Sequence, residues 1–230
     1  MNTLGLFVKH PQLGQVKTRL AERLGPEVAK ELYAAFVSDL VERFGGVAKR
    51  RVLGYSPATN DSRDYFQGLA KSRYQLWPQP EGDLGERIVS FFCDQLRDPT
   101  DRVVLIGSDS PTLPHEFVER AFAMLGAADV VLGPATDGGY YLVGFRGRCW
   151  PIFDGVTWST ATVLSQTIDR VRLAGASLAL LPPWYDVDTE ADLHLLRGHI
   201  AGLIHAGTAG DLAATTRVLG LDRESPSSGL

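Results

Sequence analysis

Apolar residues occur along the chain in short runs that alternate with helical stripes. The run Val103-Val104-Leu105-Ile106 is wholly apolar and bounded by charge and glycine, which is typical of a strand buried on both faces of a sheet. In residues 26–44 apolar side chains recur every four positions, which predicts a helix that ends at Gly45-Gly46. This alternation predicts an α/β fold with a mostly parallel central sheet.

The same patterns predict the other elements and the domain organisation. Further strands are expected at residues 4–8, 51–55, 74–77, 130–132, 140–145 and 178–181. Further helices are expected at residues 61–70, 84–96, 114–125, 160–174 and 190–200. We find no repeat and no linker, so we expect a single domain over residues 1–219 and a disordered tail over 220–230.

Charge and composition exclude several classes of protein. The 23 Lys and Arg residues against 27 Asp and Glu give a net charge of −4, which argues against a nonspecific nucleic-acid binder. The chain shows no signal peptide and no apolar run long enough to span a bilayer, so we expect a cytoplasmic protein without membrane contact. Cys93 and Cys149 form no metal or disulfide motif.

A basic loop follows the first predicted strand and leads into a helix. Lys17 and Arg19 lie close to a glycine and to the expected helix start, where backbone N–H groups and positive side chains can bind phosphate. An ordinary solvated turn is the alternative, and the spacing is not that of a Walker A loop. The candidate nucleotide-binding residues of this loop are Lys9, Gly14, Lys17, Thr18 and Arg19.

Carboxylates follow two other predicted strands. Asp109 comes directly after the central apolar run, where a carboxylate is costly unless it is paired, hydrogen-bonded or bound to a metal. Asp186 and Asp188 follow the last strand at a spacing that points both side chains the same way. Oxygen ligands without His or Cys favour Mg²⁺ or Mn²⁺. A turn role for Asp109 and a helix cap at Asp188 are the structural alternatives.

Two further segments are candidate acceptor-binding loops. The first joins a carboxylate to glycines that allow close backbone approach, although a tight turn explains it almost as well. The second contains Trp158 before a Ser-Thr pair, and from the residues alone core packing of Trp158 and a simple helix cap are favoured over an acceptor role. The residues concerned are Asp137, Gly138, Gly139 and Tyr140 in the first loop, and Trp158, Ser159 and Thr160 in the second. No Ser/His/Asp triad is recognisable, so serine hydrolase chemistry is unsupported.

Taken in order over residues 3–200, these motifs resemble the DUF2064 family. Members of that family are described as glycosyltransferases of GT-A type, or as nucleotide-diphospho-sugar transferases associated with radical-SAM and selenodomain genes. The motifs are Lys17-Thr18-Arg19-Leu20, Gly82-Asp83-Leu84-Gly85-Glu86-Arg87, Ile106-Gly107-Ser108-Asp109-Ser110-Pro111, Asp137-Gly138-Gly139-Tyr140-Tyr141, Trp158-Ser159-Thr160 and Asp186-Val187-Asp188-Thr189. The resemblance implies a three-layer α/β/α nucleotide-diphospho-sugar transferase fold.

The wider superfamily is similar to 2-phospholactate guanylyltransferases and other nucleotidylyltransferases. This resemblance implies that Lys17 and Arg19 hold a triphosphate and that Asp109 and Asp188 share Mg²⁺. It also implies a base pocket within residues 79–85, formed by Gln79, Gly82, Asp83 and Gly85. The chain lacks the GxGTR loop of nucleotidylyltransferases and has a single Asp where glycosyltransferases carry a DxD motif. Both reaction types therefore stay open.

The expected function is that of a Mg²⁺-dependent transferase acting on a nucleotide donor. Nucleotidylyl transfer from a nucleoside triphosphate to a phosphorylated small molecule is preferred, because Lys17 and Arg19 suit a triphosphate. Glycosyl transfer from a nucleotide sugar to a hydroxyl acceptor is the alternative, with Asp137 as general base. A non-catalytic nucleotide sensor is the third reading, and the oligomeric state is not readable.

Overall fold

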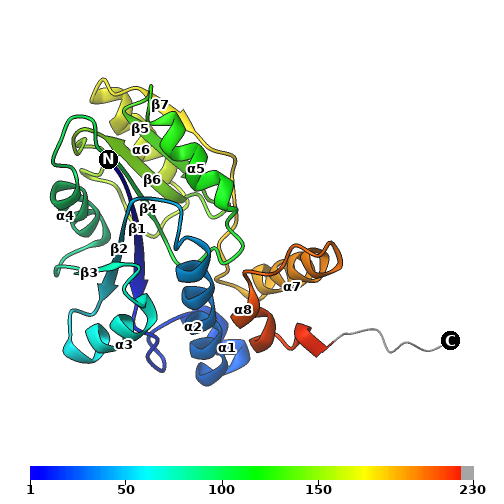
Figure 1. The fold of residues 1–230 in the computed structure, drawn as a ribbon. Helices are drawn as coiled ribbons and strands as arrows, with labels where there is room; N and C mark the ends of the chain where they lie inside the picture. Colours follow the sequence, from blue (N-terminus) through cyan, green and yellow to red (C-terminus); the bar gives the residue numbers. More distant parts are fainter. Residues whose placement is uncertain (224–230) are drawn as a thin grey trace.

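A seven-stranded sheet forms the middle of the molecule in the computed structural model, which describes residues 1–223 (Figure 1). The strand order is β3-β2-β1-β4-β6-β5-β7. Strand β6 is antiparallel to β4 and β5, whereas the other neighbouring pairs are parallel. The strands are β1 (Asn2–Lys9), β2 (Arg50–Ser56), β3 (Gln75–Pro78), β4 (Arg102–Ile106), β5 (Val130–Pro134), β6 (Tyr140–Arg146) and β7 (Leu178–Leu180).

Helices cover both faces of the sheet. Helices α2, α3 and α5 contribute to the apolar core on one face, and α4 and α6 contribute to the core on the other. The helices are α1 (Thr18–Leu24), α2 (Pro26–Arg43), α3 (Asn60–Ala70), α4 (Leu84–Gln95), α5 (His115–Met124), α6 (Val163–Leu173), α7 (Glu190–His205) and α8 (Ala213–Val218). The expected three-layer α/β/α fold with a mostly parallel sheet is therefore confirmed.

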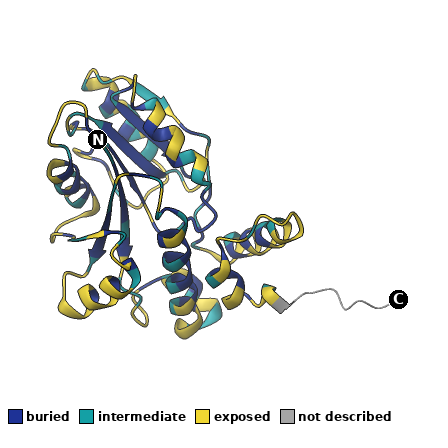
Figure 2. Cartoon of the chain, viewed as in Figure 1, coloured by how far each residue is buried: buried dark blue, intermediate teal, exposed yellow. Residues whose placement is uncertain are grey.

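Strand β4 shows why the sequences of the central strands are uninterrupted apolar runs. Val104 and Ile106 pack with α2, α3 and α5, while Val103 and Leu105 pack with α4 and α6. Because successive side chains of a strand point to opposite faces, a strand covered on both sides needs apolar residues at every position. Figure 2 shows these strands buried and the outer sides of the surrounding helices exposed.

The C-terminal helices α7 and α8 lie beside α1 and α2, off the main sheet (Figure 1). Asp39 of α2 is buried and accepts hydrogen bonds from the backbone N–H groups of Ala214 and Thr215, at 2.9 and 2.8 Å. These bonds provide partners for N–H groups at the start of α8 that have none within the helix. Sequence patterns missed α8, because a helix of 6 residues shows too little periodicity.

Several segments differ from the sequence expectation at their ends, among them α7, which continues to His205 and not only to residue 200. Helix α6 begins at Val163, because Thr160 to Thr162 form a turn whose hydroxyl groups bond locally. Leu221–Arg223 form a short 3-10 helix inside the predicted tail, and Leu221 packs against the apolar cluster of α7. Residues 224–230 of that tail lie outside the described part of the chain. Within residues 1–223, no helix has both the length and the apolar character that crossing a membrane requires.

Candidate functional site

The loops that follow β1, β4, β5 and β7 meet at one edge of the sheet. The strands β1, β4, β5 and β7 run in the same direction, so the loops at their carboxyl ends come together there. The backbone N–H of Val187, after β7, donates to the carbonyl oxygen of Asp109, after β4, at 2.9 Å. This bond fixes the two acidic segments of the sequence side by side.

Lys17 joins the two acidic segments. Its ammonium donates to Asp109 Oδ1 and to Asp188 Oδ1, the latter at 2.8 Å. The Lys17 side chain is only 2% exposed, whereas the carboxylates of Asp109 and Asp188 are 46% and 43% exposed. A buried ammonium is therefore held by two carboxylates that also face solvent.

The backbone at Lys17 explains how its side chain turns inward. Lys17 precedes α1 with φ +48°, in the left-handed region, and its carbonyl oxygen accepts the N–H of Ala21 at 2.8 Å. The ammonium also lies 6.0 Å from the ring centroid of Tyr33 and 5.8 Å from that of Phe36. Left-handed backbone at a residue other than glycine is strained, and such strain is common at functional sites.

The charges around Lys17 set its protonation. Burial alone lowers the pKa of Lys17, but the charges of Asp109 and Asp188 outweigh that effect and raise the pKa above its ordinary value. The ammonium is therefore protonated throughout the physiological range. In the ligand-free structure this ammonium is paired with the carboxylates of Asp109 and Asp188.

Asp186 occupies a different environment from Asp188, although the two are neighbours in sequence. The hydroxyl of Ser110 donates to Asp186 Oδ1. Burial raises the pKa of Asp186 to about 7, against the lowering effect of the Ser110 bond, and the charges of Asp109 and Asp137 raise it further. The Asp186 carboxyl can therefore hold a proton near neutral pH.

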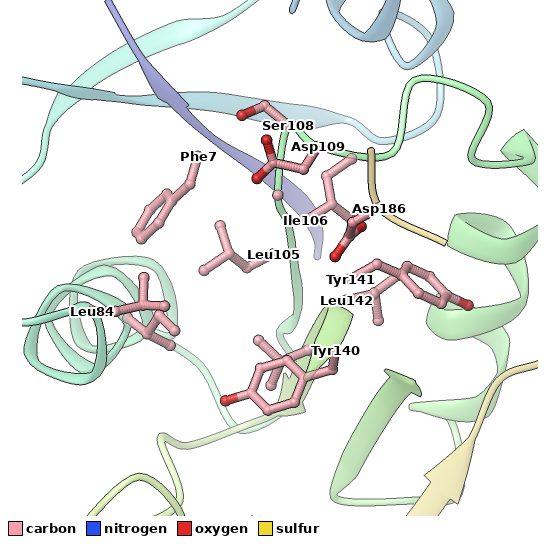
Figure 3. A pocket seen from close by; sticks show the side chains of 13 residues that line it. Phe7, Leu84, Leu105, Ile106, Ser108, Asp109, Tyr140, Tyr141, Leu142 and Asp186 are labelled. Carbon is pink, nitrogen blue, oxygen red and sulfur yellow. The ribbon is translucent and has the colours of Figure 1, made fainter. Parts of the chain in front are cut away.

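Three adjoining cavities open along this edge, and all three are lined by Leu84 and Asp109. We call them together the carboxyl-edge crevice. The first has a volume of about 230 Å³ and is largely apolar at its base. Figure 3 shows the carboxylates of Asp109 and Asp186 on one side of it and the side chains of Leu84 and Tyr140 across from them.

The second cavity, of about 490 Å³, gathers both predicted acceptor loops. It is lined by Arg19, Leu84, Asp109, Asp137, Gly139, Tyr140, Trp158, Ser159, Thr160, Ala161, Val163, Asp186 and Asp188. Asp137 is exposed, and its Oδ1 accepts the N–H of Gly139 at 2.9 Å. Gly138 has φ +92°, and a side chain there would collide with the carbonyl oxygen of Ala161. The glycine thus lets the two loops approach each other.

Trp158 packs closely against the start of α4. A Cβ atom at Gly85 would lie 2.8 Å from the indole nitrogen of Trp158, so the two segments pack closely only with glycine at this position. The ring of Tyr140 meets that of Trp158 edge to face, with centroids 6.4 Å apart. Ser159 has φ +61°, and the hydroxyl of Thr160 donates to Thr157 O at 2.8 Å. Aromatic walls therefore border the second cavity.

The third cavity, of about 260 Å³, lies beside the Lys17 ammonium on the side of β1 and β3. Gln79 lines it, and its Nε2 donates to the carbonyl oxygen of Gly54 at 2.7 Å. Lys9 also lines it, and the Lys9 ammonium donates to Gln15 O at 2.8 Å, which closes the basic loop on itself. Of the four residues predicted to form the base pocket, Gln79 lines this cavity.

Other predicted nucleotide-binding residues have structural roles in the described chain. Asp83 accepts the N–H of Glu86 at 2.9 Å, and the Glu86 carboxylate accepts the N–H of Asp83 at 2.9 Å, which is a capping box at the start of α4. Gly85 packs against Trp158, as described above. The predicted residues that do not line the three cavities are Gly14, Thr18, Gly82, Asp83, Gly85 and Gly138.

Comparisons with known proteins identify the family. The family described as "Uncharacterized protein conserved in bacteria (DUF2064)" matches residues 46–160. A proposed nucleotide-diphospho-sugar transferase from Desulfovibrio desulfuricans G20 is 35% identical, with a TM-score of 0.83 over 96% of this chain and 97% of that one. The chain belongs to the DUF2064 family. No protein with a curated description matches it.

More distant structures share the fold of this DUF2064 protein. A 4-diphosphocytidyl-2C-methyl-D-erythritol synthase is 15% identical, with a TM-score of 0.53 over 85% of this chain and 96% of the other. A nucleotidyl transferase from Methanothermobacter is 12% identical, with a TM-score of 0.53 over 86% and 97%. At this level of identity the likeness shows the fold alone, and it agrees with the fold that the motifs implied.

The carboxylates of the crevice determine whether this DUF2064 protein could hold a metal ion. Within residues 1–223 no group of three or more His, Cys, Asp or Glu side chains is arranged to hold a metal ion. The carboxylates of Asp109, Asp186 and Asp188 line the same cavity, and the Asp186 carboxylate accepts the Ser110 hydroxyl. Magnesium is often held by one or two carboxylates together with substrate phosphates, and Asp109 with Asp188 fits that mode.

Sequence reasoning gave no separate role to three residues in or beside the crevice. Leu84, which lies within the predicted base-pocket segment 79–85, lines all three cavities and is exposed. The hydroxyl of Tyr33 lies 2.8 Å from Ser108 Oγ and accepts the N–H of Lys9 at 2.9 Å. Its signal was a polar group within the apolar stripe of α2. Nothing in the sequence indicated the bond from Ser110 to Asp186.

Proposed function

We propose that this protein is a metal-assisted glycosyltransferase that moves a sugar from a nucleoside diphosphate sugar to a hydroxyl group of a small acceptor. The observation that carries the proposal is the pair of half-exposed carboxylates, Asp109 and Asp188, at the carboxyl edge of the sheet. Ligands of α/β sheets bind at this edge. The DUF2064 relative at 35% identity, itself a proposed nucleotide-diphospho-sugar transferase, supports the same class.

Asp109 and Asp188 would hold Mg²⁺ or Mn²⁺ together with the donor phosphates. When bound, the ion supplies positive charge that offsets the negative charge of the departing nucleoside diphosphate. Ser110 and the backbone bond from Val187 hold the two acidic loops in place around this position. The third cavity, with Gln79 on its wall, has room for part of the nucleoside.

The cations of the crevice favour a diphosphate over a triphosphate donor. A triphosphate needs positive side chains on both its β and γ phosphates. Without a ligand the Lys17 ammonium is paired with two carboxylates, and once released it supplies only a single charge. The Lys9 ammonium is bonded to the Gln15 carbonyl oxygen. Arg19 alone among these three cations lines the second cavity. The geometry therefore moves our preference from nucleotidylyl transfer, which the sequence favoured, to glycosyl transfer.

The second cavity favours an acceptor without negative charge. Asp109, Asp137, Asp186 and Asp188 line it, against the single guanidinium of Arg19. A phosphorylated acceptor would be repelled by this set of charges. The exposed Asp137 is placed to take the proton of an acceptor hydroxyl as the oxygen attacks the sugar carbon and the bond to the diphosphate breaks.

Nucleotidylyl transfer is the second candidate, and Arg19 is the observation that favours it. Its exposed side chain lines the second cavity next to Asp109 and Asp188, where it could bind a pyrophosphate leaving group. This reaction would release pyrophosphate from a nucleoside triphosphate, whereas glycosyl transfer would release a nucleoside diphosphate. The two reactions therefore differ in a product that can be measured.

A product assay with a matched pair of variants tests the proposal. The protein is incubated with Mg²⁺ or Mn²⁺ and with nucleotide sugars or nucleoside triphosphates, together with pools of neutral and phosphorylated acceptors. We expect nucleoside diphosphate from a nucleotide sugar, and we expect Asp109→Asn to lower the rate at least about 100-fold because the metal-linked stabilisation of the leaving group is lost. Asp169→Asn, an exposed carboxylate on α6, is the control and should retain the rate.

The other outcomes of this assay decide against the proposal. Pyrophosphate from a nucleoside triphosphate, with no product from any nucleotide sugar, would establish nucleotidylyl transfer instead. Tight nucleotide binding without either product would establish a nucleotide sensor. Equal loss of rate in Asp109→Asn and Asp169→Asn would remove the special role of the Asp109 carboxylate.

A further inference from the structure

The Lys17 ammonium occupies the space between the two carboxylates that the proposed function assigns to a metal ion. Both of its contacts are to the Oδ1 atoms that face each other across this space, in Asp109 and Asp188. The side chain is almost fully buried, although its partners are not. The site thus already contains one cation, which is supplied by the protein itself.

We propose that Lys17 is a positioning residue that serves as the resident cation of this carboxylate pair, and that a divalent metal binds there only when a nucleotide accompanies it. The inference rests on the proposed function in one respect, since it takes Asp109 and Asp188 as the metal-binding carboxylates. It adds an order of binding that the proposed function does not contain.

Geometry makes the two cations alternatives at the same oxygen atoms. Magnesium binds carboxylate oxygen at about 2.0–2.1 Å, so an ion shared by the two Oδ1 atoms would lie within about 5 Å of the Lys17 nitrogen. Positive charges at that separation repel strongly in a partly buried site. Either the ammonium or the metal can hold the Oδ1 atoms, but the two together are disfavoured.

The third cavity offers space for the Lys17 ammonium when it releases the carboxylates. The third cavity borders Lys17 and Asp109 on the side of β1. A lysine ammonium sits on a flexible stem of four methylene groups, so it can change partners without a change of backbone. The phosphates of an incoming nucleotide provide a new anionic partner, and they also provide further oxygen ligands for the metal.

A metal without a nucleotide offers Lys17 no such partner. It would have to displace a buried ammonium that is doubly hydrogen-bonded, and the displaced charge would be left unpaired. Metal and nucleotide should therefore strengthen each other's binding by the same factor, because the coupling free energy between two ligands is reciprocal. Metal–phosphate bonds alone also couple the two ligands, so the contribution of Lys17 is the part of the coupling that is lost when its charge is removed.

The test is a titration of the whole protein with Mn²⁺ in the absence and in the presence of a nucleoside diphosphate, followed by electron paramagnetic resonance of the unbound ion. Variants are Lys17→Met, which keeps the chain length without the charge, and Lys17→Gln. We expect both to bind Mn²⁺ without nucleotide at least about tenfold more tightly than the wild type. Arg172→Met removes an exposed charge on α6 that lies outside the crevice and should change the affinity no more than about twofold.

The double variant Lys17→Met with Asp109→Asn locates the effect. The gain in Mn²⁺ affinity should disappear in it, since the ion would lose one of its carboxylates. Thermal unfolding of each variant, followed by circular dichroism, shows whether the protein is folded at the titration temperature. Lys17→Gln replaces Lys17→Met if the latter is unfolded there.

Three outcomes overturn the inference, and they separate it from the proposed function. If Lys17→Met and the wild type bind Mn²⁺ equally with and without nucleotide, Lys17 is not a resident cation, and the proposed function stands. If the wild type binds Mn²⁺ tightly without nucleotide, the order of binding is wrong. If no variant binds Mn²⁺ even with UDP, GDP, ADP or CDP, the metal-binding part of the proposed function fails as well.

Discussion

Two buried cations hold the same loop after β4, and they do so with different partners. Lys17 contacts the carboxylate of Asp109, whereas Arg43, at the end of α2, donates from Nη1 to the carbonyl oxygens of Pro111 and Leu113 at 2.7 and 2.9 Å. Arg43 also forms a two-bond ion pair with Asp211, at 2.6 and 3.0 Å. Both side chains are nearly inaccessible to solvent.

The hydrogen-bond partners of Lys17 and Arg43 determine which of these side chains a ligand could displace. Two of the bonds of Arg43 go to backbone carbonyl oxygens, which are part of the fold and cannot move to a ligand. Lys17 is held only through side chains that face the crevice, at Asp109 and Asp188. We infer that burial of a charge is not enough to separate a structural ion pair from a functional one. The exposure and mobility of its partners are the better guide.

The largest expected effect on stability is at Arg43. Arg43→Met leaves two buried carbonyl oxygens without their donor and Asp211 without its ion pair, so we expect a loss of about 3 kcal/mol in the free energy of unfolding. Urea unfolding followed by fluorescence measures this loss. Arg172→Met, which removes an exposed ion pair with Asp169, is the control and should stay within about 0.5 kcal/mol of the wild type. Equal effects of the two substitutions would contradict a structural role for Arg43.

A second prediction concerns the pH dependence of stability at Asp186. Its pKa of about 7 in the fold lies above the ordinary value, so the native state holds a proton that the unfolded chain releases. The stability contributed by that proton is complete below about pH 4 and is lost as the pH rises to about 7. Asp186→Asn should therefore raise the free energy of unfolding by about 2 kcal/mol at pH 8, with little change at pH 4. A difference that is the same at both pH values would refute this assignment.

The smallest expected effect on stability is at Lys17 itself. Lys17→Met should cost only about 1 kcal/mol in the free energy of unfolding, because the half-exposed Asp109 and Asp188 remain hydrated after the ammonium is lost. Urea unfolding at moderate salt concentration, in parallel with Arg43→Met, gives the direct comparison. A loss as large as that of Arg43→Met would make Lys17 a structural residue as well.

Local patterns were enough to predict most of the fold. The apolar run at 103–106 and the helical stripe at 26–44 correspond to β4 and α2. A strand packed on both faces requires a continuous apolar run, and a helix packed on one face requires apolar residues at helical spacing. Helix α8, with 6 residues, is too short to show such a pattern. Its start depends on Asp39, which is 175 residues away from Ala214 in sequence, so only the tertiary structure makes it visible.

The candidate site was predictable as a set of residues but not as an arrangement. Strand ends located Lys17, Asp109 and Asp188, since loops at the carboxyl ends of parallel strands converge. Their pairing was not readable, because Lys17 and Asp109 are 92 residues apart. The motif that begins at Gly82 is implied to bind nucleotide by the family resemblance, and its Asp83 and Glu86 also have the spacing of a capping box, which the structure contains.

Calorimetric titration of the wild-type protein with UDP, GDP, ADP and CDP, each in Mn²⁺ and in EDTA, measures whether the crevice binds a metal and a nucleotide together. We predict that at least one of these nucleotides binds, and that Mn²⁺ strengthens its binding at least about tenfold, because the metal would link the Asp109 and Asp188 carboxylates to the nucleotide phosphates. Binding that is equally tight in EDTA would contradict the central claim that the crevice is a site for a metal and a nucleotide together.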